Sequence, residues 1–266
     1  MIEYVPGYYK DFRCIADKCR HTCCAGWEID VDDDSLGRFS EIDDIMSNIR
    51  DGCMVLDKEE RCPFLLPSGL CRMIKEYGEK MLCDICREHP RFHNDMGDHI
   101  ETGLGLTCEE ACRLILTHEE KFTLVPPREL PLGIRIMTDR DNPVSKRLSA
   151  LCPFDEDTDQ EVSYFMEMER LDERWTSMLQ KVLSVRPSKD ERDLYIDSHP
   201  VQFEQFAVYL LYRHGERRLF AVRSAYLLAD ICLSTGEDIL EAARMFSTEV
   251  EYSDINDEII SSEEIL

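Results

Sequence analysis

The stretch Cys14-Ile-Ala-Asp-Lys-Cys19-Arg-His-Thr-Cys23-Cys24-Ala-Gly-Trp27 places four thiols within eleven residues near the start of the chain. A hydrophobic core does not require so many small sulfur side chains. Thiolate is, in contrast, the soft ligand that binds zinc, copper(I) or the iron of iron–sulfur clusters. The stretch therefore predicts a metal centre around which the first half of the protein folds.

The other cysteines are distributed unevenly, which predicts two zones. The first zone holds Cys14, Cys19, Cys23, Cys24, Cys53, Cys62, Cys71, Cys83, Cys86, Cys108 and Cys112. Only Cys152 and Cys232 follow, and we expect both to be reduced, buried residues that pack as small hydrophobic side chains. Cys83 and Cys86 have the C-x2-C spacing that lets two thiolates reach one metal. The adjacent Cys23-Cys24 pair favours a polynuclear cluster or two neighbouring sites, and His21 and His89 are expected to be helpers or surface residues.

Composition and charge restrict the classes of partner. The chain has 266 residues and a formal net charge of -24, which argues against nucleic-acid binding because phosphate contacts need clustered Lys and Arg. The charge is compatible with a basic protein substrate, although a well-solvated surface is the simpler explanation. The N-terminus resembles no signal peptide, and no apolar run reaches the ~18 residues of a membrane span. We expect a cytoplasmic, reducing location without a membrane partner.

The pattern of apolar residues predicts a mainly α fold, with a small, irregular α+β, cysteine-rich N-terminal half pinned by metal and a helical C-terminal half. Helices are expected over about 32–49, 73–81, 108–117, 161–182, 201–213, 218–232 and 238–246, and strands over 92–94 and 99–104. Residues 1–125 are predicted to form a cysteine-cluster metal-binding domain, 126–158 a proline-rich linker or irregular crossover, and 159–266 a helical domain.

Acidic residues follow the opening motif at Asp30, Asp32, Asp33 and Asp34. The last three suit the first turn of a helix, where carboxylates face the positive end of the helix dipole. A role in gripping a substrate lysine is the alternative. The sequence Thr102-Gly103-Leu-Gly105-Leu-Thr-Cys108 is expected to form a tight turn that presents Cys108, and Thr107 is the expected N-cap of the helix that follows.

Four cysteine-bearing segments together resemble a known family. The first segment contains Phe12-Arg-Cys14, then Cys19, then Cys23-Cys24-Ala-Gly-Trp27-Glu-Ile-Asp30. The second contains Cys62-Pro-Phe-Leu followed by Gly69-Leu-Cys71-Arg. The third is Cys86-Arg-Glu-His-Pro-Arg91, and the fourth is Leu106-Thr-Cys108-Glu-Glu-Ala. This pattern resembles the bacterial flagellin lysine-N-methylase family and, more widely, putative zinc- or iron-chelating cysteine-cluster proteins. Arg213-His214 and the segment Phe246-Ser-Thr-Glu-Val-Glu-Tyr-Ser-Asp are similar to the family's C-terminal half, so the resemblance spans nearly the whole chain.

The resemblance implies N-methylation of lysine side chains on flagellin or another lysine-bearing protein. S-adenosyl-L-methionine would be the methyl donor, and an iron–sulfur cluster, expected to be 4Fe-4S, would be required; zinc is the alternative metal. Carried over by position, the implied ligands are Cys14, Cys19, Cys23, Cys24, Cys62, Cys71, Cys86 and Cys108. The family pattern requires no cysteine at Cys83, whereas spacing alone makes Cys83 the partner of Cys86.

Two departures leave the donor site and the catalytic residues unassigned. The chain lacks the C-x3-C-x2-C run of radical S-adenosylmethionine enzymes and the glycine-rich loop of classical methyltransferases. Two readings from other classes therefore stay open: a non-catalytic zinc- or iron-chelating protein, and a structural zinc module that presents a helical interaction domain.

Overall fold

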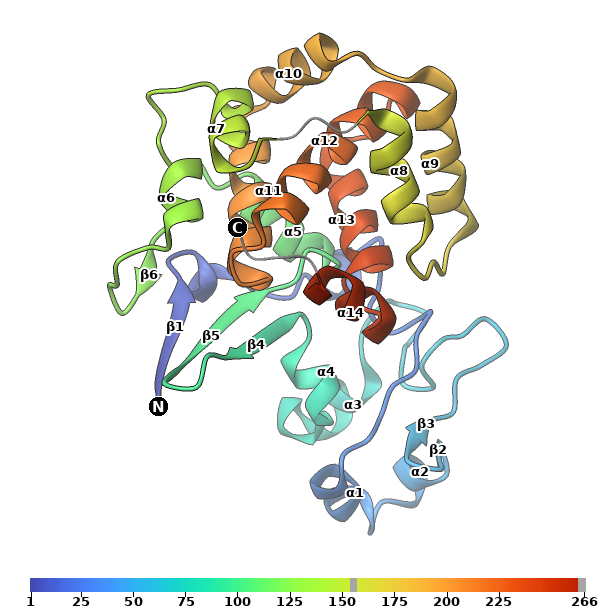
Figure 1. Ribbon diagram of the computed structural model, residues 1–266. Helices are drawn as coiled ribbons and strands as arrows, with labels where there is room; N and C mark the ends of the chain where they lie inside the picture. The colour runs from blue at the N-terminus through green and yellow to red at the C-terminus, as the bar shows by residue number, and fades with distance from the viewer. Residues whose placement is uncertain (154–156, 263–266) are drawn as a thin grey trace. The chain divides into compact units, whose positions relative to one another are not determined.

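A computed structural model describes residues 1–153 and 157–262 of the chain (Figure 1). The described residues form two compact units. One contains Met1–Phe12 and the chain from His93 onward, and we call it the helical unit. The other, Arg13–Phe92, is the cysteine unit, and it interrupts the helical unit in sequence.

The helical unit contains a four-stranded sheet with the strand order β4-β5-β1-β6. Its strands are β1 (Ile2–Pro6), β4 (Arg91–Asp95), β5 (His99–Leu104) and β6 (Leu124–Val125). The boundary between the two units falls inside β4, after Phe92. β1 pairs in parallel with β5, with Ile2 opposite His99, and pairs antiparallel with β6. The expected strands at 92–94 and 99–104 are therefore confirmed.

The rest of this unit is helical, and α12 is its central element. This helix is buried along nearly its whole length and packs against α9, α10, α11 and α13. An apolar surface on all sides is the pattern expected of a helix enclosed by others. The helices of the unit are α5 (Glu109–Leu116), α6 (Leu132–Met137), α7 (Val144–Leu151), α8 (Thr158–Met166), α9 (Glu173–Val185), α10 (Lys189–Ser198), α11 (Pro200–Arg213), α12 (Arg218–Thr235), α13 (Ile239–Val250) and α14 (Asp254–Ser262), with the 3-10 turn η1 (Tyr9–Asp11) before them.

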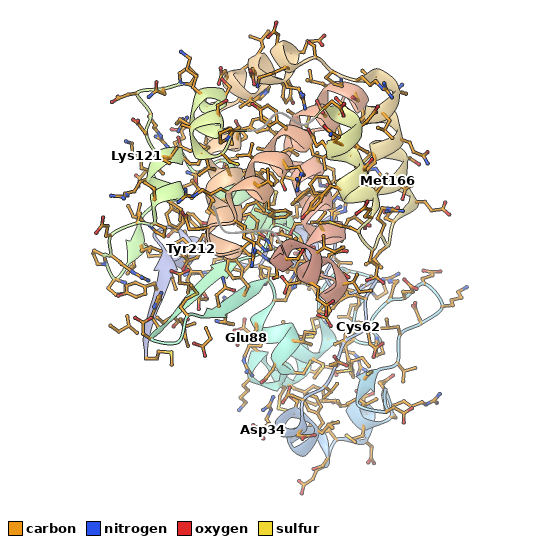
Figure 2. The ribbon with its side chains drawn as sticks, in the orientation of Figure 1. Asp34, Cys62, Glu88, Lys121, Met166 and Tyr212 are labelled. Carbon is orange, nitrogen blue, oxygen red and sulfur yellow. The ribbon has the colours of Figure 1, made fainter. Side chains whose placement is uncertain are left out.

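The cysteine unit is made of short elements joined by loops. They are η2 (Ala16–Lys18), α1 (Asp33–Phe39), α2 (Asp43–Met46), β2 (Ile49–Arg50), β3 (Cys53–Met54), α3 (Arg72–Tyr77), η3 (Glu79–Met81) and α4 (Asp84–Glu88). Its core is small: Ile29, Val31, Phe39, Ile45, Met54, Phe64, Met73 and the thiol of Cys83 are buried. Figure 2 labels Asp34, Cys62 and Glu88 of this unit. The mainly α fold class, with a small sheet in the cysteine-rich N-terminal half and a helical C-terminal half, is confirmed.

Several predicted helices are longer than the observed ones. The segment 32–49 forms α1 and α2, which are separated at residues 40–42. The segment 161–182 likewise forms α8 and α9, and between them Glu249 accepts hydrogen bonds from the N–H groups of Leu171 and Asp172, at 2.8 and 3.1 Å. Periodic apolar residues do not reveal such breaks, because the buried face continues across the interruption. The helix at 189–198 was not predicted.

The compact units divide the chain elsewhere than the predicted domains do. The predicted limits lie at 125/126 and 158/159, whereas the structural units meet at 12/13 and 92/93. Within the predicted linker, 126–158, the structure has α6 and α7, which pack against α11. Residues 154–156 of that linker and 263–266 of the predicted helical domain lie outside the described residues. Among the described helices, none combines the length and the apolar character needed to cross a bilayer.

A buried ion-pair cluster ties α11 to the end of α13. Glu251 Oε1 lies 2.7 Å from His214 Nε2 and 3.3 Å from Arg213 Nε, and Glu251 Oε2 accepts the Tyr209 hydroxyl at 2.8 Å. Burial alone would raise the pKa of Glu251, but the Arg213 guanidinium and the His214 ring lower it to about 2. The cluster therefore stabilises the helical unit while this carboxylate is ionised.

Replacing Glu251 with glutamine is expected to destabilise the helical unit by about 3 kcal/mol at neutral pH, because Arg213 would lose its buried counter-charge. The wild-type contribution is fully present above the unfolded pKa of about 4.3 and is lost as the pH falls toward 2. Denaturant unfolding, followed by far-ultraviolet circular dichroism across this pH range, measures both effects. The exposed Glu258→Gln change is the matched control, and equal pH profiles for the two variants would contradict the assignment.

Candidate metal centre

Five thiols of the cysteine unit interact with one another: Cys24, Cys62, Cys71, Cys83 and Cys86. The charges of Cys24, Cys71 and Cys83 act on the thiol of Cys62, and those of Cys24 and Cys83 act on Cys71. Cys86 donates a hydrogen bond to Cys83 and is within the electrostatic influence of Cys24 and Cys62. We call this group the thiol cluster.

Backbone pairing draws the segments of the thiol cluster together. The N–H of Cys62 donates to the carbonyl of Cys24 at 2.8 Å, and Ala25 and Arg61 form an antiparallel bridge beside it. A second bridge joins Leu65 and Cys71 across the turn at 67–69. These contacts connect three cysteines that are separated by up to 47 positions in the sequence (71 − 24).

The turn before Cys71 also contacts the opening motif. Gly69 has a φ of +81°, and a Cβ added to it would lie 3.1 Å from the Cα of Asp17. Any other residue would therefore be strained by its backbone angle and would also press against the segment between Cys14 and Cys19. This close approach holds the opening motif against the turn that presents Cys71.

Backbone N–H groups donate to several of the sulfur atoms. Phe64 donates to Cys62, Ile74 and Met73 donate to Cys71, and the N–H of Cys86 donates to Cys83. Cys71 and Cys83 are also the N-cap residues of α3 and α4. The unpaired N–H groups and positive end of a helix stabilise a negative sulfur, as N–H groups do around iron–sulfur clusters.

The five thiols differ in acidity, with Cys24 and Cys83 the most acidic. A hydrogen bond from the Cys23 thiol lowers the pKa of Cys24 to about 6, and one from the Cys86 thiol lowers the pKa of Cys83 to about 7. Burial raises the pKa of Cys62 to about 11 and raises that of Cys71. The hydrogen bond that Cys86 donates to Cys83 raises the pKa of Cys86, and burial raises it further. Without a cation, the group therefore favours a mixture of thiols and thiolates.

This donor set fits a thiolate-bound metal. The sulfur atoms converge from four segments, are partly or fully buried, and receive N–H donors that suit negative sulfur. Four thiolates would complete a tetrahedral zinc site or an iron–sulfur cluster, and a positive metal core would offset their mutual repulsion.

Of the eight ligands implied by the family resemblance, the thiol cluster contains Cys24, Cys62, Cys71 and Cys86, and Cys23 contacts it by donating to Cys24. Cys83, left out by the resemblance, also belongs to the cluster. Cys14 is exposed and accepts the N–H of Ala16 at 3.4 Å, while Cys19 donates to the carbonyl of His21 at 3.3 Å. Ligation by each of these residues stays a prediction.

Cys108, the eighth implied ligand, belongs to the helical unit and is the N-cap of α5. The expected N-cap, Thr107, instead places its hydroxyl 2.8 Å from that of Thr248. His89 is in the cysteine unit, with its ring centroid 5.9 Å from that of Trp27. Burial and, as the smaller cause, the positive charge of Arg91 lower the pKa of His89 to about 4. Its imidazole is therefore neutral at pH 7.

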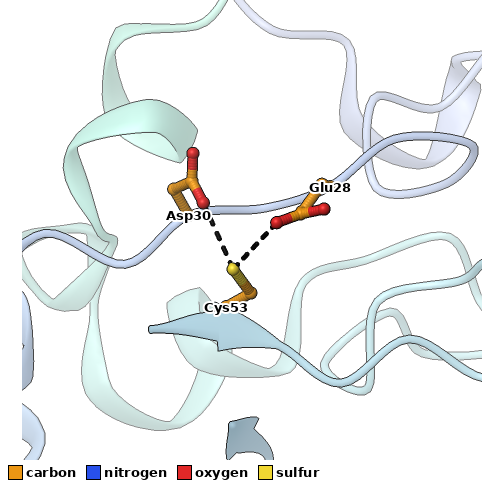
Figure 3. A group of neighbouring side chains, drawn as sticks. All are labelled: Glu28, Asp30 and Cys53. Atoms are coloured by element: carbon orange, nitrogen blue, oxygen red, sulfur yellow. Dashed lines mark hydrogen bonds between the residues drawn. The ribbon is translucent and has the colours of Figure 1, made fainter. Parts of the chain in front are cut away.

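The acidic residues after the motif separate into two groups. Asp32 is the N-cap of α1 and accepts the N–H groups of Ser35 and Asp84, at 2.8 and 2.9 Å, which ties α1 to α4. Asp33 and Asp34 occupy the first turn of α1, as expected. Asp30 instead lies beside Glu28 and Cys53 (Figure 3). Sequence spacing gave no signal for this trio, because Cys53 follows Asp30 by 23 positions.

Comparison with known proteins gives relatives for part of the chain. The chain is 28% identical over 134 residues to proteins named lysine-N-methylase from Salmonella choleraesuis and Salmonella typhimurium. It is 27% identical over 134 residues to the flagellar biosynthetic protein FliU of Salmonella muenchen. Each match covers 45% of this chain, so the chain is a distant homologue of these proteins. The resemblance to this family is therefore confirmed over 45% of the chain, not over nearly the whole chain as the sequence pattern predicted.

The match covers a different share of the length of each relative. The chain spans about a third of the length of the two lysine-N-methylases (33%) and 79% of the FliU protein. No protein-family model matches the chain, and no solved structure matches it.

The acidity of Cys24 gives a chemical test of the thiol cluster. In metal-free, reduced protein at pH 7, Cys24 is expected to react with iodoacetamide as a thiolate, because its pKa lies near 6. Replacing Cys23 with alanine removes the donor and should slow alkylation of Cys24 on the order of tenfold. Peptide mass spectrometry over a time course measures the rate. An unchanged rate in the variant would contradict the contact, and Cys53, with a pKa near 12, is the slow internal reference.

Proposed function

We propose that this protein is an S-adenosyl-L-methionine-dependent protein-lysine N-methyltransferase that acts on flagellin and requires an iron–sulfur cluster held by N-terminal cysteines. The observation that carries the proposal is the distant homology to lysine-N-methylases and to a flagellar biosynthetic protein. The convergence of Cys24, Cys62, Cys71, Cys83 and Cys86 supports the metal requirement. The strong negative charge suits a basic protein surface as substrate.

The proposed ligands come from the eight cysteines implied by the resemblance, Cys14, Cys19, Cys23, Cys24, Cys62, Cys71, Cys86 and Cys108. To these we add Cys83, because its sulfur accepts hydrogen bonds from the Cys86 thiol and from a backbone N–H. The many free thiols favour a reducing location, for which we propose the cytoplasm.

Lysine methylation imposes chemical requirements of its own. The Nζ lone pair of the substrate lysine attacks the methyl carbon of the sulfonium donor, the carbon–sulfur bond breaks, and S-adenosylhomocysteine leaves. A lysine is mostly protonated at neutral pH, so a proton must leave Nζ before the attack. A desolvated pocket or a neighbouring base lowers the free energy of forming the neutral amine. When bound, an iron–sulfur cluster would supply organisation of the cysteine unit and a redox-active iron centre.

Metal-dependent methylation is tested with protein purified without oxygen. We expect broad visible absorption, with iron and acid-labile sulfide in comparable amounts, and transfer of labelled methyl groups from the donor to flagellin lysines in the presence of a reductant. Cys62→Ala should remove most of the bound iron and reduce methylation on the order of a hundredfold or more, because it removes a ligand. Cys152→Ala, at a buried cysteine of the helical unit, should leave both unchanged.

The alternatives predict different outcomes of the same preparation. Colourless protein with stoichiometric zinc would contradict the iron–sulfur assignment and would favour a structural zinc module that presents the helical unit. An intact cluster without methyl transfer, with reductant and flagellin present, would contradict the enzyme assignment. That result would favour a non-catalytic zinc- or iron-chelating protein.

A further inference from the structure

We propose a second metal site, separate from the thiol cluster, in which Glu28, Asp30 and Cys53 bind a divalent transition-metal ion such as zinc or iron(II). One potential ligand atom from each residue lies within 4.8 Å of the other two (Figure 3). Cys53 Sγ is 3.0 Å from Glu28 Oε1 and 3.2 Å from Asp30 Oδ1. This site does not depend on the proposed methyltransferase activity.

The backbone fixes this convergence. Residues 28–31 are extended and run beside the β2–β3 hairpin: Met54 N–H donates to Ile29 O at 2.9 Å, and Val31 N–H donates to Gly52 O at 2.7 Å. Asp30 and Cys53 form an antiparallel bridge between these two segments. The three side chains are therefore carried by paired backbone, which limits the rearrangement that metal binding would need.

Alternation along the extended segment places both carboxylates on one face. Ile29 and Val31 are buried in the core of the cysteine unit, at 1% and 6% exposure. Since successive side chains of an extended segment point to opposite faces, Glu28 and Asp30 point away from that core, toward Cys53. The same apolar packing that folds the segment thus holds the two carboxylates together.

The charges around the trio favour a cation. In the described part of the chain, no lysine, arginine or histidine forms an ion pair with Glu28 or Asp30. Arg50 lines the same cavity, opposite Cys53 in the β2–β3 hairpin. The two carboxylates repel each other, and a divalent cation would offset that repulsion. The thiol makes the trio different from an ordinary acidic surface patch, because it adds a soft ligand to two hard ones.

The mixed ligand set indicates the class of metal. Magnesium and calcium prefer oxygen ligands alone, whereas zinc and iron(II) accept both thiolate sulfur and carboxylate oxygen. On binding, the Cys53 sulfur–hydrogen bond breaks, the sulfur–metal bond forms and the proton passes to solvent, with no change of oxidation state. The ion, with charge +2, meets three ligands with total charge −3.

A cavity beside the trio leaves room for a fourth ligand. It has a volume of about 510 Å³, and Glu28 and Cys53 contribute to its lining together with Trp27 and Met54. Three protein ligands with an open position are the arrangement of catalytic rather than structural zinc sites. The metal would therefore bind water or a small oxygen- or nitrogen-containing ligand from the cavity.

Cobalt(II) is the probe for this site, because thiolate ligation gives it an intense near-ultraviolet charge-transfer band. The test uses full-length protein, purified without oxygen, with its native metal content measured and the thiol cluster loaded. We expect one further equivalent of cobalt(II) to bind with a thiolate band. Cys53→Ser should abolish the band. Asp30→Asn should weaken cobalt(II) binding on the order of tenfold or more, because it removes one charged ligand.

Asp51→Asn is the matched control, since it makes the same charge change in the same cavity wall outside the trio. It should leave the cobalt(II) affinity and the band unchanged. The proposal is overturned if wild-type protein binds no further cobalt(II), if the band persists in Cys53→Ser, or if Asp51→Asn and Asp30→Asn weaken binding equally. Circular dichroism and native metal content establish that each variant is folded. Loss of methylation would not bear on this result, because the readout is cobalt(II) binding.

Discussion

The mutual repulsion of closely placed thiolates is the constraint on which the cysteine unit depends. Its apolar core has few residues, its helices are short, and Cys83 is itself part of the core. Five thiols that act electrostatically on one another would oppose this packing if they ionised together without a cation. A positive metal core converts that repulsion into attraction, so in the proposed centre metal binding and folding of the unit are coupled.

The sequence was most informative where chemistry determines residue type. The density of cysteines predicted where thiols would gather, and the C-x2-C spacing identified Cys83 as the partner of Cys86, which the structure brings into contact. The family resemblance omitted Cys83 because a pattern shared among relatives need not include every thiol of one chain. Helix breaks were missed since they depend on tertiary hydrogen bonds, such as those of Glu249 to the loop before α9.

The trio of Glu28, Asp30 and Cys53 shows another limit of reading by spacing. Glu28 and Asp30 alternate with buried Ile29 and Val31, so the sequence does reveal that both carboxylates leave the core. What it does not reveal is the register of pairing that places Cys53 opposite Asp30. A shift of one residue would point Cys53 to the opposite face, so this site depends on the register of a very short hairpin.

The order of the units along the chain has a consequence for folding. Met1–Phe12 belongs to the helical unit, and β1 pairs in parallel with β5, which follows the whole cysteine unit in sequence. Forming that pair closes a loop of roughly a hundred residues, whose entropic cost grows only slowly with length. If the residues within the loop are already ordered, closing the loop removes less conformational entropy. A metal that orders the cysteine unit would thereby also favour closure of the sheet, so its influence would extend to β1 of the helical unit through loop closure.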